Sequence, residues 1–227
     1  MTTLYVIATP IGNLGDISSR ALKILSEVDT ILCEDTRVTK KLLSHFGITT
    51  RTMSYDAHTS GSKHQAILEM LSNGRDLALV SDAGTPCISD PGVMLINEIY
   101  KEFGDKIKIS PIPGASALTA LLSVSGLSSM PFTFLGFIPQ KKGRETFFKK
   151  LNDYDHTVVM YESPHRFMKT IESLAKNIDD KKIVVIGREI TKMFEEIIRG
   201  NIQEISMYFK ENSSRVRGEF TIIIGHQ

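Results

Sequence analysis

The sequence predicts an α/β protein of two α/β domains, the first with a mostly parallel five-stranded sheet and the second with a mixed sheet. In the first half, short apolar segments rich in β-branched residues alternate with amphipathic segments of helical period. The segment "PIPG" at 111–114 stiffens the chain and then lets it turn, which is typical of a boundary. We therefore expect an N-terminal domain at 1–113 and a C-terminal domain at 114–227.

The first domain is expected to alternate strand and helix from its first residues. Behind a serine cap, Ala21 and Leu25 fall on one helical face. Gly47 is placed to close the next helix, and Asp90 and Pro91 suit the cap and first turn of the last helix. The expected strands are 4–9, 30–35, 51–55, 76–82 and 106–112, and the helices between them are 18–28, 36–47, 62–74 and 90–104.

The second domain is expected to begin with an apolar helix at 115–126. Ser163 and Pro164 suit the cap and first turn of a later helix. The late strands lie close together in the sequence, which indicates a mixed sheet. The expected strands are 132–138, 157–162, 182–189 and 219–225, and the later helices are 144–151, 165–178 and 202–212.

The composition is that of an ordinary soluble globular protein, with 41% apolar residues, 23% charged residues and a net charge of +1. The molecule as a whole is therefore not strongly attractive to nucleic acid. Cys33 and Cys87 form neither a disulfide framework nor a metal motif, and the six histidines are scattered, so no metal is expected. We find no signal-peptide pattern and no membrane-spanning apolar run, and we expect a cytoplasmic protein.

Four loops of small residues follow expected strands of the first domain: "TPIGNLGD", "CEDTR", "SDAGTPCISDPG" and "PIPGAS". Because ligands bind beyond the carboxyl ends of parallel strands, these loops should form one rim around a ligand site. No phosphate-binding motif is present. The loops also carry several carboxylates, which disfavours a polyphosphate ligand and favours one with a cationic centre and an amino group. These carboxylates are Asp16, Glu34, Asp35, Asp82 and Asp90.

Charged residues of both signs gather in three segments of the second half: "YESPHR", "GREITKMFEE" and "RGEF". Each segment follows, joins or begins an expected strand. Ion pairs between neighbouring elements and a functional role are alternatives of about equal weight for these residues. They are Glu162, His165, Arg166, Arg188, Glu189, Lys192 and Glu195.

Taken in order, the motifs of this chain resemble those of the ribosomal RNA small subunit methyltransferase I family, within the tetrapyrrole methylase superfamily. The matching segments are "TPIGNLGDIS", "CEDTR", "SDAGTPCISDPG", "PGASAL", "GFIP", "YESPHR", "REITKMFEE" and "RGEFT". The resemblance covers essentially the whole chain, and "DAGTPCISDPG" and "ESPHR" are its most specific parts. Many members of the family continue past "RGEFTIIIG" into a small extension, whereas this sequence ends at Gln227.

The resemblance implies S-adenosylmethionine as methyl donor, folded into a cleft between the two domains of a homodimeric enzyme. It implies 2′-O-ribose methylation of a cytidine in the decoding region of 16S rRNA, in the small ribosomal subunit. The sulfonium and amino-acid tail of the donor would explain a narrow pocket of small residues without a phosphate cradle. The donor contacts implied by position are Pro10, Gly12, Asn13, Asp82, Ala83, Gly84, Thr85, Pro86, Ser116, Ala117, Met160, Tyr161, Glu162, Glu189 and Ile190.

A ribose hydroxyl attacks a methyl carbon readily only as its proton leaves, so a positioned general base is expected. The candidates for this catalytic base are Glu34, Asp35, Glu162 and His165. Contacts to phosphate position RNA without reading its sequence. The candidates for RNA binding are Arg37, Arg166, Arg188 and Lys192.

Two other functions stay open at this point. A C-methyltransferase acting on a tetrapyrrole, such as uroporphyrinogen or a precorrin, would share the fold and the donor. A non-catalytic ribosome-binding protein would keep the pocket without turnover. Donor binding separates the binding protein from the enzymes, and methyl transfer to rRNA or to porphyrin separates the two enzymes.

Overall fold

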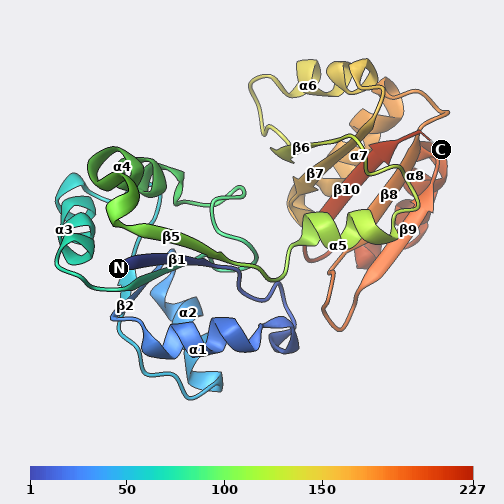
Figure 1. Ribbon diagram of the computed structural model, residues 1–227. Coiled ribbons are helices and arrows are strands. Elements are labelled where there is room, and N and C mark those ends of the chain that lie inside the picture. The colour runs from blue at the N-terminus through green and yellow to red at the C-terminus, as the bar shows by residue number, and fades with distance from the viewer. Residues whose placement is uncertain (227) are drawn as a thin grey trace. The chain divides into compact units, whose positions relative to one another are not determined.

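The computed structural model describes residues 1–226 and divides the chain into two compact units. The first unit is Met1–Ser116 and the second begins at Ala117, whereas the sequence predicts a boundary at 113/114. Each unit has its own five-stranded sheet covered by helices (Figure 1). Within the described residues, neither unit contains a helix that is long and apolar enough to cross a bilayer.

The sheet of the first unit is wholly parallel, with the strand order β3-β2-β4-β1-β5. The register pairs Leu4 with Leu77 on one side and with Ile109 on the other. β2 and β4 are buried along their whole length, as expected for strands covered on both faces. The five predicted strands are confirmed: β1 (Thr3–Ile7), β2 (Thr30–Cys33), β3 (Thr52–Ser54), β4 (Leu77–Val80) and β5 (Lys108–Ile112).

Four helices cover the two faces of this sheet. α1 and α2 pack on one face through Ala21, Leu25 and Leu43. α3 and α4 pack on the other face through Ile67 and Leu95, so the unit has three layers (Figure 1). The helices are α1 (Ser19–Glu27), α2 (Thr36–His45), α3 (Gly61–Ser72) and α4 (Val93–Phe103), with the 3-10 helices η1 (Leu14–Asp16) and η2 (Gly104–Lys106).

The start of α4 differs from the sequence prediction. The helix begins at Val93 rather than at Asp90, and its N-cap residue is Gly92, with no side-chain cap. Gly92 has a φ of 136°, which glycine adopts without strain. A Cβ at this position would lie 2.5 Å from Cys87 Sγ, so the loop closes tightly onto itself before the helix starts. Asp90 therefore belongs to the loop and not to the helix cap.

The sheet of the second unit is mixed, with the strand order β6-β7-β10-β8-β9. β6 and β7 run parallel, and the other neighbours are antiparallel. The sequence predicts four of these strands and misses β9, an edge strand whose residues alternate between half-buried and exposed. The strands are β6 (Phe132–Phe137), β7 (Thr157–Glu162), β8 (Ile183–Arg188), β9 (Glu196–Gly200) and β10 (Phe220–Gly225).

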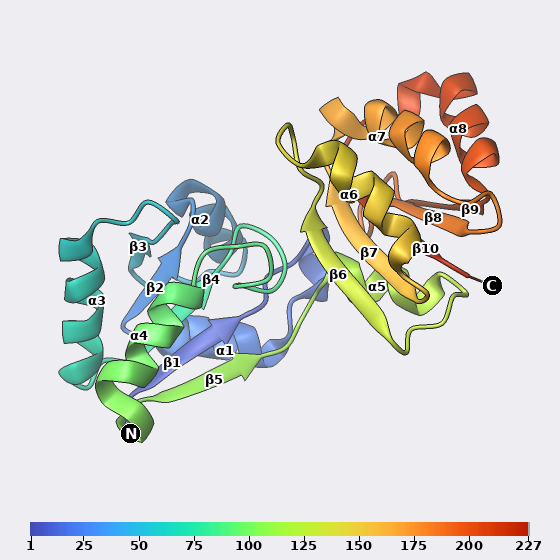
Figure 2. The same ribbon diagram turned by 90° about the horizontal axis from the view of Figure 1, so that it is seen from above.

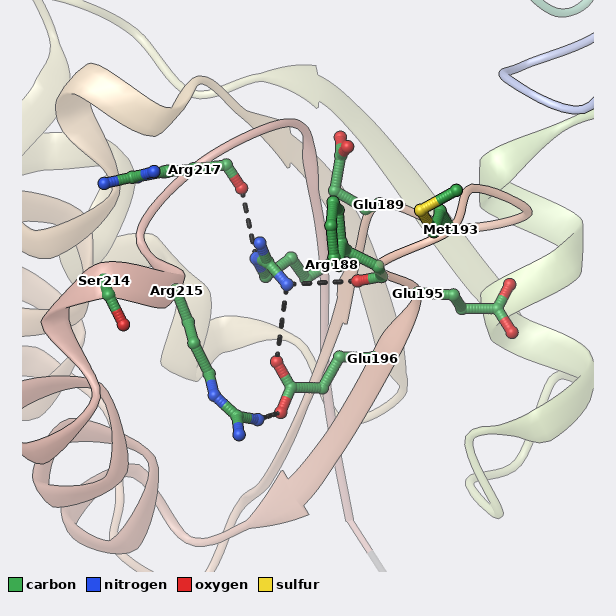
Figure 3. A pocket seen from close by; sticks show the side chains of 9 residues that line it. Arg188, Glu189, Met193, Glu195, Glu196, Ser214, Arg215 and Arg217 are labelled. Atoms are coloured by element: carbon green, nitrogen blue, oxygen red, sulfur yellow. Dashed lines mark hydrogen bonds and ion pairs between the residues drawn. The ribbon is translucent and has the colours of Figure 1, made fainter.

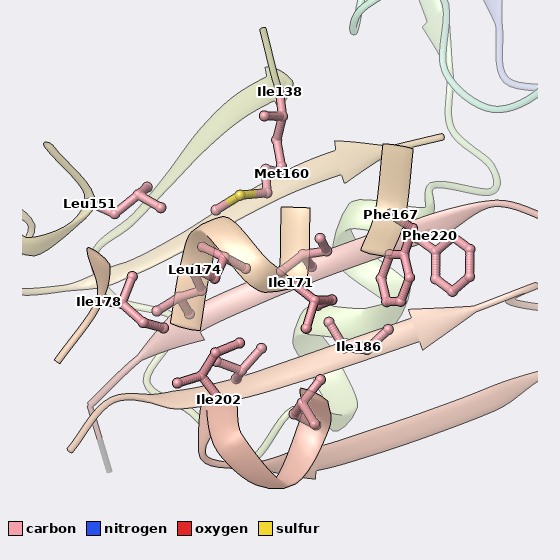
Figure 4. Packing of buried hydrophobic residues seen from close by; sticks show 14 of the residues in the cluster. Ile138, Leu151, Met160, Phe167, Ile171, Leu174, Ile178, Ile186, Ile202 and Phe220 are labelled. Carbon is pink, nitrogen blue, oxygen red and sulfur yellow. The ribbon is translucent and has the colours of Figure 1, made fainter. Parts of the chain in front are cut away.

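Helices cover both faces of the second sheet as well (Figure 2). On one face the core centres on Phe167, whose ring stacks on Phe220 with 3.8 Å between centroids (Figure 4). On the other face Leu121 of α5 packs over Gly187, where a Cβ would come within 2.8 Å of the leucine. The helices are α5 (Ala117–Val124), α6 (Arg144–Lys150), α7 (Pro164–Asn177) and α8 (Ile202–Glu211), with the 3-10 helices η3 (Leu151–Asp153) and η4 (Ser213–Arg215).

Candidate functional site

The chain changes direction around β4. The segments after β1 and β2 lead to α1 and α2 on one face of the first sheet, whereas the segment after β4 leads to α4 on the other face. β4 lies between β2 and β1 in the sheet. The loop after β4 therefore turns toward one face of the sheet, and the loops after its two neighbours turn toward the other face. In open parallel sheets, ligands bind at such a switch point, outside the carboxyl ends of the strands.

The loops after β1 and β4 are tied together at this edge. The Thr9 amide donates to the Gly84 carbonyl at 2.9 Å, and the Gly84 amide donates back to the Thr9 carbonyl at 3.1 Å. The Thr9 hydroxyl donates to the Ser81 carbonyl at 3.1 Å. The Thr85 hydroxyl donates to the Ala115 carbonyl at 3.3 Å, which brings in the segment after β5. The expectation that these loops share one rim is confirmed.

The segment after β5 passes close to the residue that follows β1, which leaves little room for a side chain at position 114. A Cβ on Gly114 would lie 3.0 Å from Ala8 Cβ and 3.2 Å from the Ala8 carbonyl oxygen. The rim is therefore a surface of backbone groups and small side chains. The residues assigned to the donor that lie on the rim are Pro10, Gly12, Asn13, Asp82, Ala83, Gly84, Thr85, Pro86 and Ser116, and Ala117 begins the second unit.

Carboxylates lie on the β2 side of the rim. The Asp35 amide donates to Asp82 Oδ1 at 3.0 Å, which joins the loop after β2 to the loop after β4. Burial, and then the charge of Glu34, raise the pKa of Asp90 to about 6. Burial, and then the charges of Asp82, Asp56 and Asp35, raise the pKa of Glu34. Among residues 1–226, no three His, Cys, Asp or Glu side chains are arranged to hold a metal ion.

The two base candidates on this rim differ in their surroundings. Asp35 caps α2 by accepting from the Arg37 amide at 2.8 Å, and Arg37 Nη2 lies 2.6 Å from its other oxygen. The hydrogen bonds from the Arg37 side chain and amide lower the pKa of Asp35 to about 2. A carboxylate that holds its charge so firmly is a poor proton acceptor. Glu34 is exposed and its pKa moves in the opposite direction.

Replacing Asp90 with asparagine is expected to stabilise the protein above pH 6 and to change little near pH 4. The pKa of Asp90 is raised in the folded state, so its contribution to stability is complete below the ordinary value of 3.8 and is lost as pH rises through about 6. Since the carboxyl is partly exposed, the gain at pH 8 is on the order of 1 kcal/mol. Urea unfolding at both pH values measures it.

Asp105→Asn, at an exposed carboxylate of η2, is the matched control and should change the free energy of unfolding by less than about 0.5 kcal/mol at either pH. An Asp90→Asn variant that is no more stable than the wild type at pH 8 would contradict the prediction.

In the second unit, the carboxylate of Glu162 is fully buried at the end of β7. Arg166 Nη2 lies 2.6 Å from one of its oxygens, and Arg144 Nη1 lies 3.6 Å from the other. The Thr170 hydroxyl and the Ser163 amide donate to it at 2.6 and 2.7 Å. Both arginines also donate to carbonyls of the loop after β6. For Glu162 and Arg166 the structure therefore shows the ion-pair alternative.

The residues around Glu162 have different surroundings. Met160 is completely buried in the core, so any contact it makes with a ligand comes from its backbone. Tyr161 lies edge-on to Phe134 and Phe137, at 4.9 and 5.5 Å between ring centroids. His165, the remaining base candidate, is exposed on α7.

The turn between β8 and β9 holds the other assigned residues. Arg188 is buried and donates to two backbone carbonyls of neighbouring segments. Lys192 Nζ lies 2.8 Å from a carboxylate oxygen of Glu189 and 2.8 Å from one of Glu219. Ile190 is buried. Of the cations predicted to contact RNA, Arg188, Lys192 and Arg166 are thus engaged within the protein.

A cavity of about 570 Å³ lies between this turn and the segment that leads from η4 to β10 (Figure 3). The sequence gives no signal for several of its residues, because Met193 and Phe194 become notable within this charged turn only once the structure shows that they are exposed. The lining residues are Arg188, Glu189, Met193, Phe194, Glu195, Glu196, Ser214, Arg215 and Arg217.

The chain matches the family model of the tetrapyrrole (corrin/porphyrin) methylases over residues 3–206. A solved cobalt precorrin-4 methyltransferase has a TM-score of 0.67 at 18% identity, covering 98% of this chain and 94% of that one. A solved diphthine synthase has a TM-score of 0.68 at 14% identity, covering 99% of this chain and 90% of that one. These structural similarities concern the fold, and the family match defines the class: the chain belongs to the tetrapyrrole (corrin/porphyrin) methylase family.

Curated relatives define the family within that class. The ribosomal RNA small subunit methyltransferase I of Synechocystis sp. is 43% identical over 226 residues, which are 99% of this chain and 79% of the relative. The protein of the same name from Bacillus subtilis is 42% identical over 226 residues, covering 99% and 75%. The one from Escherichia coli O157:H7 is 41% identical over 226 residues, covering 99% and 78%. The chain belongs to the ribosomal RNA small subunit methyltransferase I family.

Proposed function

We propose that this protein transfers a methyl group from S-adenosylmethionine to the ribose 2′-oxygen of a cytidine in the decoding region of 16S rRNA, in the small ribosomal subunit. The observation that carries the proposal is the rim beside β4, where Thr9, Gly84 and Thr85 join the loops after β1 and β4 and the segment after β5. Membership of the rRNA methyltransferase family supports the choice of substrate. A homodimer and a cytoplasmic location complete the proposal, as the resemblance implies.

The groups on the rim fit the methyl donor. S-adenosylmethionine, when bound, supplies a methyl group activated by its sulfonium charge. Ala83 is exposed, so its backbone groups can face a ligand, whereas the Gly84 amide and carbonyl are bonded to Thr9 and hold the loop in place. The carboxylate of Asp82 can accept from an ammonium group. The proposal assigns donor contacts to Pro10, Gly12, Asn13, Asp82, Ala83, Gly84, Thr85, Pro86, Ser116, Ala117, Met160, Tyr161, Glu162, Glu189 and Ile190.

We assign the general base to Glu34. Glu34 is accessible to solvent, and its partial burial, together with the charges of three neighbouring carboxylates, raises its pKa and makes it a better base than a free glutamate. The hydrogen bonds from Arg37 lower the pKa of Asp35, which weakens it as a base. Glu162 is fully buried and its oxygens are occupied by Arg144, Arg166, Thr170 and Ser163. His165 is the competing assignment, since it is exposed and carries an imidazole.

We assign the main contact with RNA phosphate to Arg37. Its side chain is 86% exposed, and its one ion pair, with Asp35, is open to solvent. Arg166 and Arg188 donate to backbone carbonyls and Lys192 is paired with Glu189 and Glu219, so each would reach a phosphate only after giving up a partner. An exposed arginine on the same side as the carboxylates also offsets their repulsion of the RNA backbone.

A tetrapyrrole C-methyltransferase is the second candidate, because solved enzymes of that kind share the fold. We therefore expect purified protein with labelled S-adenosylmethionine to label 16S rRNA in small ribosomal subunits and not uroporphyrinogen. Mass spectrometry of the digested rRNA should place the label on one cytidine ribose. Label in the porphyrin, or in neither substrate, would refute the proposal, and calorimetry with the donor would then distinguish a binding protein from an enzyme.

Gly114→Val tests the rim itself. The added side chain must push the segment after β5 away from Ala8, so donor affinity should fall by at least about tenfold. Gly61→Val is the matched control, because a Cβ at Gly61 meets nothing within 4 Å. Calorimetry with S-adenosylmethionine measures both variants. Equal affinities for the two would show that the donor binds elsewhere.

A further inference from the structure

The turn between β8 and β9 exposes two large apolar side chains. Met193 is 90% exposed and Phe194 is 65% exposed, although both lie within the charged segment "REITKMFEE". Single exposed apolar residues are common on protein surfaces. Two adjacent ones at the tip of a turn that borders a cavity need a further explanation.

The backbone holds this tip in one place. Glu189 and Thr191 have φ values of 52° and 70°, in the left-handed region that residues other than glycine adopt only rarely. Lys192 bridges Glu189 to Glu219 across the base of the turn. Glu195 accepts from the Thr191 amide at 2.6 Å, which closes the turn on its other side. The apolar tip is therefore displayed on a rigid support.

The neighbouring cavity leaves one cation available. Glu196 is engaged by Arg188 at 3.7 Å and by Arg215, and Arg215 also lies over the ring of Tyr208. Arg217 is exposed, and its guanidinium points away from these groups (Figure 3). Within the part of the chain that the structure describes, no side-chain partner of Arg217 is found. Phe194 and Arg217 thus border the same cavity from two different segments, and an exposed phenyl ring and a free guanidinium can bind a base and a phosphate of one strand.

We propose that the tip formed by Met193 and Phe194, together with Arg217, binds a single-stranded segment of the RNA substrate. One base stacks on the ring of Phe194, and the guanidinium of Arg217 contacts a phosphate. Aromatic platforms beside positive charges are the physical basis of single-strand binding, because every base has a π face. The inference rests on the proposed function for its substrate class, and it adds a contact that lies away from the rim of the first unit.

A second copy of this chain is the other occupant that would cover an apolar tip. RNA is favoured as the occupant because each nucleotide carries both a base that can stack on Phe194 and a phosphate that can pair with Arg217. A protein partner would use Arg217 only if it supplied a carboxylate. Of the three glutamates that line the cavity, Glu189 and Glu196 are already paired with cations, and Glu195 accepts from the Thr191 amide.

The test measures binding of the full-length protein to a fluorescent single-stranded oligoribonucleotide of about 12 nucleotides by anisotropy. Phe194→Ala should weaken binding by about 5- to 100-fold, and Met207→Ala, at a methionine that is 56% exposed on α8, should not. An abasic site in the oligonucleotide should weaken binding by the wild type and not by Phe194→Ala, because the two changes remove the same stack.

Arg217→Gln should reduce the slope of log binding constant against log salt concentration by about 0.7, whereas Arg51→Gln should not change it.

Three outcomes would overturn the inference. The wild type fails to bind the oligonucleotide; Phe194→Ala and Met207→Ala bind it equally; or Phe194→Ala converts a dimer to a monomer in sedimentation, which would assign the tip to a second copy. Methyl transfer to small ribosomal subunits by the wild type is measured in parallel. Transfer without the Phe194 effect refutes this contact alone, and absence of transfer refutes the proposed function.

Discussion

Replacing Glu34 with glutamine is expected to lower the rate of methyl transfer at saturating donor by about 100-fold or more and to leave donor affinity unchanged. Glutamine keeps the size and polarity of the side chain but cannot accept the ribose proton. The pKa of Glu34 is raised by burial and then by Asp82, Asp56 and Asp35, so the wild-type carboxylate is a better base than a free one. Single-turnover assays on small ribosomal subunits, with calorimetry for the donor, separate the two quantities.

The pH dependence provides an independent check on Glu34. A base must be deprotonated, so the wild-type rate should fall as pH decreases through the raised pKa of Glu34, and the residual activity of Glu34→Gln should lack that limb. Asp35→Asn is the comparison, because the pKa of Asp35 lies at about 2 and its removal should cost less. Full turnover in Glu34→Gln, or a greater loss in Asp35→Asn, would move the base elsewhere, with His165→Ala as the next variant.

Replacing Glu162 with alanine is expected to lower the free energy of unfolding by about 3–5 kcal/mol. The substitution leaves Arg144 and Arg166 near a buried site without their shared anion, and it removes the acceptor for the Thr170 hydroxyl and the Ser163 amide. Uncompensated charge at a buried position is among the largest single-residue effects on stability. Denaturant unfolding followed by circular dichroism measures it.

Two controls separate this structural role of Glu162 from catalysis. Glu145→Ala, at an exposed carboxylate of α6, should change stability by less than about 0.5 kcal/mol. Glu162→Gln should lose stability in proportion to its lost ion pairs and keep the turnover of the fraction that is folded. If Glu162→Gln is instead as stable as the wild type but has no turnover, Glu162 is the base and the assignment to Glu34 is wrong.

The elements of the first unit were predictable because their signals are local. The apolar run "LALV" indicates a strand within four residues, and the spacing of Ala21 and Leu25 on one face indicates a helix within a few residues. The start of α4 could not be predicted in this way. Asp90 and Pro91 satisfy the local rules for a helix cap, but the helix starts only after Gly92, which packs too tightly against Cys87 to carry a side chain. A tertiary approach overrode a local preference there.

The second unit shows the same limit in another form. β9 was not predicted. Its residues alternate between half-buried and exposed, so "EIIRG" lacks the continuous apolar run that marks the buried strands β8 and β10. The motif "YESPHR" marked Glu162 and Arg166 as special but did not reveal Arg144, which comes from a different helix. Their pairing is a property of packing between α6, α7 and β7.

The sequence by itself determined the alternation of elements, the small-residue loops after β1, β4 and β5, and the family resemblance, because each of these is written in contiguous residues. Only the tertiary structure decided which charged groups are free. Arg188 is occupied by the carbonyl of a residue 29 positions away, and Asp35 is joined to Asp82 across 47 positions. The chemical availability of a side chain depends on its neighbours in space, and folding brings those neighbours from parts of the chain that no local pattern connects.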